Sequence, residues 1–181
     1  MTESTSALLA PWSSFYAMTG SAAAALTGLM FIVITLVSGV ERLRRNPDGI
    51  STYSTPTVVH FCAAFSISAL LCAPWRTPIA PAAILALAAF VGIAYVARTT
   101  LRSRGLVAYE PDFEDWASYS ILPLIAYGAI LAGAVLFAFA GRSAAADGLF
   151  AIAGAVTLLI LIGIHNAWDV VTFIATGRPT E

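Results

Sequence analysis

The stretch FYAMTGSAAAALTGLMFIVITLVSGV, residues 15–40, contains no charged side chain. A helix that crosses a lipid bilayer needs roughly 17–25 mostly apolar residues, so this stretch is long enough to be one. It is also much longer than the ~7–15-residue apolar core of a secretory signal peptide, and no Lys or Arg precedes it. We therefore expect residues 15–40 to remain in the mature protein as a transmembrane helix.

Four more apolar segments of similar character follow, at residues 56–73, 79–97, 117–140 and 149–176. They do not alternate with polar residues as the strands of a membrane barrel do, and they are longer than such strands. The composition agrees, because 59% of the 181 residues are hydrophobic and 10% are charged, against about 25% charged residues in soluble domains. The sequence therefore predicts an all-α integral membrane protein. It is a single membrane domain, a bundle of five transmembrane helices, with no separate soluble domain.

Several residues mark expected helix boundaries. Thr55 followed by Pro56 is typical of a capping residue and a first helical residue, since the missing N–H of proline is harmless there. Asp147 is placed to cap the helix over 149–176. Pro123 removes one backbone hydrogen bond early in the segment 117–140, so we expect a kink there.

The arginines beside the apolar segments indicate orientation, because cytoplasmic loops carry an excess of basic residues. One side of the membrane receives Arg42, Arg44, Arg45, Arg98, Arg102, Arg104 and Arg178. The opposite side receives Arg76 and Arg142. This distribution predicts an N-terminus outside the cell and a C-terminus in the cytoplasm.

The basic residues also indicate a source and exclude one class of partner. All nine are Arg and none is Lys, and Ala is frequent, a composition typical of a GC-rich bacterium. We therefore expect a multi-pass protein of the bacterial inner membrane. The net charge of −1 gives no field that would attract nucleic acid, so the expected surroundings are the lipid bilayer and other membrane proteins.

Small residues recur at four-residue spacing, which places them in stripes along the predicted helices. These residues are Gly20, Ala24 and Gly28 in the first segment, Ala88 and Gly92 in the third, and Ala129 and Gly133 in the fourth. Membrane helices approach closely along such stripes. The pattern predicts either tight packing within the bundle or contacts in a homo-oligomer or a larger membrane complex.

Polar side chains within the predicted spans are few, and four of them define a candidate site. The two histidines are His60, near the predicted cytoplasmic start of its helix, and His165, near the cytoplasmic end of the last one. Asp169 is one turn from His165 on the same helix face, and Asn166 lies about 100° round from it. Because ionisable groups in a membrane are costly, they point to a site in the bundle interior.

Two functional hypotheses follow from these residues. In the first, His60, His165, Asn166 and Asp169 line a polar pathway or ligand pocket near the cytoplasmic leaflet. Histidine can carry protons in such a place, because its pKa lies near neutrality. In the second, His60 and His165 ligate a metal ion or a haem iron from two different helices.

A third hypothesis is structural. His165 would then bond to Asp169 or Asn166, and the group would leave the hydrocarbon beside Trp168. The length of the last segment favours it, because a helix over 149–176 would be about 42 Å long, against roughly 30 Å of hydrocarbon.

The sequence contains none of the enzyme motifs that can be tested directly. It has no His-Glu-x-x-His zinc motif, no Cys-x-x-Cys pair, no Gly-x-Ser-x-Gly elbow and no phosphate-binding Walker loop. We therefore favour a non-enzymatic role, first as a channel- or transporter-like component. The alternatives are a haem- or metal-binding redox subunit and a non-catalytic accessory or scaffold subunit of a membrane complex.

Overall fold

The computed structural model describes residues 5–38, 47–103 and 116–176. These parts of the chain are almost entirely helical and include no strand. In chain order the elements are α1 (Thr5–Leu9), η1 (Ala10–Trp12), α2 (Ser13–Ser38), α4 (Pro47–Cys72), α5 (Ile79–Ser103), η2 (Ala117–Ile121), α7 (Leu122–Phe139) and α8 (Arg142–Thr176).

Five helical stretches are long and apolar enough to cross a membrane. They are Thr5–Thr35, Thr55–Cys72, Ile79–Leu101, Ala117–Phe139 and Ser143–Thr172. The predicted all-helical fold with five such helices is therefore confirmed. The arginines at 42, 44, 45, 104 and 178, which carry most of the orientation argument, lie outside the described residues, so the orientation stays a prediction.

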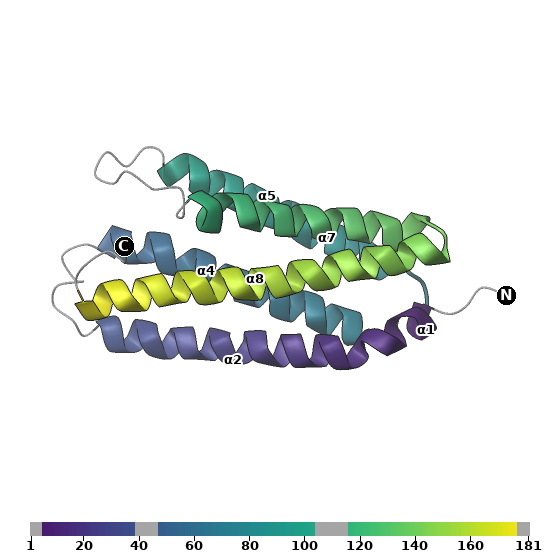
Figure 1. Ribbon diagram of the computed structural model, residues 1–181, viewed down its shortest axis with the longest axis horizontal. Helices are drawn as coiled ribbons and strands as arrows, with labels where there is room; N and C mark the ends of the chain where they lie inside the picture. The colour runs from purple at the N-terminus through teal and green to yellow at the C-terminus, as the bar shows by residue number, and fades with distance from the viewer. Residues whose placement is uncertain (1–4, 39–46, 104–115, 177–181) are drawn as a thin grey trace.

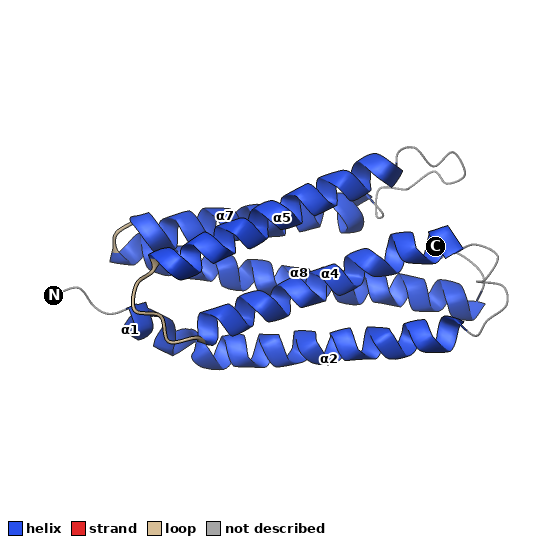
Figure 2. Cartoon of the chain, turned by 180° about the vertical axis from the view of Figure 1, so that it is seen from behind, coloured by secondary structure: helices blue, strands red, loops and turns tan. Residues whose placement is uncertain are grey.

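The long helices lie side by side along the length of the molecule (Figure 1). One end of the bundle, called here the α1 end, holds α1 and the turn from α7 to α8. The loop from α4 to α5 also lies there, as the view from behind shows (Figure 2). At the opposite end α4 begins and α8 finishes, so these two helices run antiparallel.

Helix α8 lies at the centre of the bundle. It packs extensively against α7 on one side and α4 on the other, and it also touches α2. The outer helices pack mainly on one neighbour each, α5 on α7 and α2 on α4. Half of the most apolar window of α8 is buried, against 22% for the first span. A polar side chain on the inner face of α8 is therefore placed deep in the bundle.

The outward faces of the helices carry large apolar side chains. Among the most exposed are Phe139 at 79%, Phe150 at 67%, Phe90 at 66% and Met18 at 64%. Single exposed apolar residues are normal in water-soluble proteins, but extended apolar surfaces mark contact with lipid or with another protein. The helices of this chain therefore carry apolar residues both on the faces that pack within the bundle and on the faces that point outward.

Two expected helix starts are wrong. Helix α4 begins at Pro47 instead of Pro56, which is buried inside the helix. A proline inside a helix loses one backbone hydrogen bond, and helices packed among others tolerate that loss. Helix α8 begins at Arg142, so Asp147 does not cap it and instead lies exposed within the helix. The three alanines before Asp147 are strong helix formers and explain the earlier start.

A short π-helix, η2, stands immediately before Pro123, where the sequence predicts a kink. The N–H of Leu122 donates to the carbonyl of Ala117, a bond one residue longer than the α-helical pattern. Such wide turns are a known source of helix irregularity. Ser120, within η2, is buried, and its hydroxyl lies 2.8 Å from that of Thr100 on α5.

The small residues do not all lie at helix contacts. Gly20 is buried beside Ser68, and a Cβ added to Gly133 would lie 2.6 Å from the carbonyl oxygen of Gly148. Ala24 and Gly28, by contrast, are exposed, and a Cβ on Gly28 would meet nothing within 4 Å. The buried face of α2 instead follows Tyr16, Ala23 and Met30.

Candidate functional site

His60 is buried in the middle of α4 and contacts Tyr127 of α7. Its exposed fraction is 1%, and its Nδ1 atom lies 3.1 Å from the Tyr127 hydroxyl. The two rings are tilted, with centroids 5.8 Å apart. The Tyr127 ring lies directly against Gly92 of α5, where a larger residue would overlap it. Through Tyr127, His60 of α4 is thereby connected to α7 and to α5.

The sequence did not single out Tyr127, although a signal was present. A buried tyrosine usually needs a hydrogen-bond partner for its hydroxyl, so a tyrosine in an apolar segment is itself a candidate for a polar contact. The partner could not be predicted, because His60 is 67 positions away in the chain.

Asn166 of α8 is the most unusual side chain in the described part of the chain. It is fully buried, with 0% of its surface exposed. Neither its Oδ1 nor its Nδ2 atom has a hydrogen-bond partner among the described protein groups. The buried Thr19, by contrast, lies 3.1 Å from Ser68 and also donates to a backbone carbonyl. Because buried polar groups are nearly always hydrogen-bonded in proteins, this amide calls for an explanation.

Asn166 lies at the same level of the bundle as His60. Gly163 of α8 packs directly against the ring of Phe61 on α4, which fixes the register of these two antiparallel helices. Asn166 is three residues farther toward the opposite end, about 4.5 Å along the helix. His60 and the buried Thr57 precede Phe61 in that same direction. We call Thr57, His60, Tyr127 and Asn166 the polar layer.

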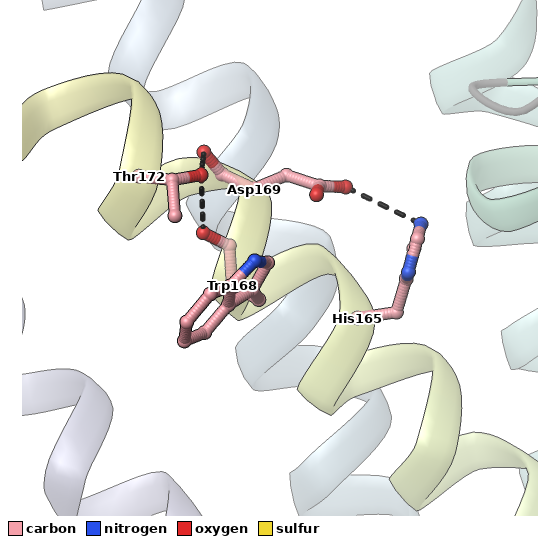
Figure 3. A network of polar contacts seen from close by, with 4 residues as sticks. All are labelled: His165, Trp168, Asp169 and Thr172. Atoms are coloured by element: carbon pink, nitrogen blue, oxygen red, sulfur yellow. Dashed lines mark hydrogen bonds and ion pairs between the residues drawn. The ribbon is translucent and has the colours of Figure 1, made fainter. Parts of the chain in front are cut away.

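His165 and Asp169 form a separate pair on α8. Nε2 of His165 lies 3.4 Å from Oδ2 of Asp169, with the two side chains 40% and 28% exposed. Both extend to the same side of the helix (Figure 3). Thr172 donates to the backbone carbonyl of Trp168, whose side chain is 65% exposed. The pairing expected from the one-turn spacing is therefore present, at a partly exposed position.

The four predicted site residues thus divide into two groups. His60 and Asn166 are buried in the polar layer, whereas His165 and Asp169 lie nearer the surface. The two histidines have different neighbours, Tyr127 for one and Asp169 for the other. Within the described ranges, no three His, Cys, Asp or Glu side chains are grouped closely enough to hold a metal ion. Ligation of a metal or a haem by the two histidines stays a prediction.

Compared with protein-family models, with curated proteins and with solved structures, the chain has no match. What the fold defines is a class: an all-helical bundle with five helices long and apolar enough to span a membrane.

Proposed function

We propose that this protein is a multi-pass protein of a bacterial inner membrane and that it acts as a channel- or transporter-like component with a polar binding site. The five apolar helices and the large apolar side chains on their outer faces support the membrane location. Spanning helices suit this environment because they satisfy their own backbone hydrogen bonds. The arginine-only composition supports a bacterial source.

The distribution of arginines supports an N-terminus outside and a C-terminus in the cytoplasm. In that orientation the opposite end of the bundle faces the cytoplasm. The polar layer then lies in the cytoplasmic half of the membrane, because His60 is near the start of the span Thr55–Cys72 and Asn166 is near the end of Ser143–Thr172. His165, next to Asn166 in the chain, lies at the level of that layer, and its partly exposed partner Asp169 lies one helical turn closer to the cytoplasm.

The single observation that carries the proposal is the buried, unpartnered amide of Asn166. Leaving such a group unsatisfied costs about 1–3 kcal/mol, and a leucine would fill a similar volume without that cost. Binding of a polar species to the amide explains why an asparagine stands at position 166. The position fits, because α8 is the central helix and the His60–Tyr127 pair lies at the same depth.

The test is reconstitution of the purified chain into lipid vesicles, followed by flux measurements with polar solutes and ions. Vesicles with the wild-type chain should be more permeable than empty vesicles to at least one of them, and Asn166→Leu should remove the difference. Ser68→Ala is the matched control, because it removes a buried hydroxyl nearer the α1 end. Wild-type vesicles indistinguishable from empty ones across the whole panel would refute the proposal.

A further inference from the structure

We infer that the polar layer binds a small uncharged solute with both hydrogen-bond donors and acceptors, of the amide or alcohol class, and not an ion. This inference rests on the proposed function and names the substrate class of the same site. The charge, the hydrogen-bonding groups and the packing of the layer all favour such a solute.

The buried polar side chains of the described residues include no Asp, Glu, Lys or Arg. They are threonines, serines, two tyrosines, one histidine and one asparagine: Thr5, Tyr16, Thr19, Thr57, His60, Ser68, Ser118, Ser120, Tyr127 and Asn166. The charged side chains Arg76, Arg98 and Asp147 are exposed, and Asp169 is partly exposed beside His165. An ion in a low-dielectric interior needs a buried counter-charge or a full shell of ligands. The polar layer offers neither among its four side chains.

The hydrogen-bonding groups of the layer suit a neutral solute instead. The amide of Asn166 presents an acceptor oxygen beside an NH₂ donor, so it matches a molecule with an adjacent donor and acceptor. The His60–Tyr127 contact can be formed with either atom as the donor. The pair can therefore present a donor or an acceptor to a solute while both side chains stay uncharged.

The packing around the layer limits the size of the solute. Gly163 lies against the ring of Phe61 beside Asn166, and Gly92 lies against the ring of Tyr127. At both places the helix backbone touches an aromatic ring, and a Cβ would already overlap it. Because the helices pack this closely at the level of the layer, the probes chosen are the smallest solutes of the class: formamide, acetamide and glycerol.

The experiment uses the full chain in lipid vesicles and compares two sets of probes. Stopped-flow light scattering measures entry of formamide, acetamide and glycerol, and fluorescent indicators measure entry of Na⁺, Cl⁻ and H⁺. We expect wild-type vesicles to admit at least one neutral probe at least fivefold faster than Asn166→Leu vesicles. The ion rates should equal those of empty vesicles for both chains. Ser68→Ala should behave as wild type.

Two results separate the failure of this inference from that of the proposed function. Ion entry that exceeds empty vesicles and falls in Asn166→Leu would overturn the neutral substrate class while supporting a transporter. No flux of either kind would overturn both. If Asn166→Leu elutes as aggregate, Asn166→Val replaces it, since a valine side chain has neither a hydrogen-bond donor nor an acceptor. Asn166→Gln keeps the donor and the acceptor of the amide and should retain part of the neutral flux, and loss as complete as in Asn166→Val would contradict the role of the amide.

Discussion

The hydroxyl of Tyr127 on α7 lies 3.1 Å from Nδ1 of His60 on α4, and this contact joins two helices through the interior of the bundle. Tyr127→Phe removes the hydroxyl and leaves the ring in place against Gly92. Hydrogen bonds between membrane helices average about 0.6 kcal/mol, so we expect a loss of stability of that order. Reversible unfolding in mixed detergent micelles measures it.

The control for this prediction is a double-mutant cycle with His60→Leu. If the two residues interact, Tyr127→Phe should change the free energy of unfolding much less when His60 is already replaced. Equal effects of Tyr127→Phe in both backgrounds would show that the hydroxyl contributes nothing through His60.

The contact between Gly92 and Tyr127 gives a second prediction. In Gly92→Ala the new methyl group would overlap the tyrosine ring, so we expect a loss of about 1–3 kcal/mol, the usual cost of overpacking. Gly28→Ala is the matched control, because its methyl group meets nothing within 4 Å. That variant should be neutral or gain up to about 1 kcal/mol from its higher helix propensity. Melting temperatures of both variants in one detergent compare them, and a similar loss in both would contradict the packing described.

The His165–Asp169 pair allows a third prediction, which separates stability from function. Partly exposed ion pairs contribute only about 0.2–1 kcal/mol, so the double variant with both residues changed to Ala should fold with a nearly unchanged melting temperature. Under the proposed function it should still alter flux, because His165 adjoins Asn166 on α8 and Asp169 lies one turn closer to the cytoplasm. Normal flux in a normally folded double variant would assign the pair a purely structural role.

An absorption spectrum with metal analysis addresses the cofactor alternative. Under the proposed function, protein purified from cells grown with iron and haem should show no Soret band and no stoichiometric metal. A band or a metal that disappears in both His60→Ala and His165→Ala would instead support the redox-subunit hypothesis. Loss in only one variant would contradict joint ligation by the two histidines.

The helical class followed from the sequence because it depends only on the length and character of the apolar runs. The faces on which the helices pack against one another did not follow from the sequence. Residues 22–25 are four alanines in a row, so the spacing of small residues fits several faces equally well. The sequence favoured Ala24 and Gly28, whereas the face of α2 toward the bundle carries Ala23. Only the neighbouring helices decide between such faces.

The sequence identified the four residues of the candidate site, but it did not predict that they form two separate groups. His165 and Asn166 are adjacent, so the sequence places them in one polar arc about 100° wide. The structure turns Asn166 into the core and leaves His165 partly exposed, because α8 is covered on two sides by α4 and α7. The contact of His60 with Tyr127 depends on three-dimensional packing, which no local pattern encodes.

The position of Pro56 was missed for a related reason. Proline is common at the first residue of a helix and is also tolerated inside helices that pack among others. Nothing in the residues next to Pro56 distinguishes the two cases. The helix continues through it from Pro47, and this places His60 in the middle of α4 instead of near its start.

The central claim is that Asn166 is present to bind a solute and not to hold the bundle together. The most direct measurement determines the melting temperature and the solute flux of Asn166→Leu in the same preparation, beside wild type and Ser68→Ala. The prediction is that stability equals that of wild type or is higher by about 1–3 kcal/mol, because an unsatisfied amide is removed, whereas flux is lost. A variant that is destabilised while its flux per folded molecule stays at the wild-type level would contradict it.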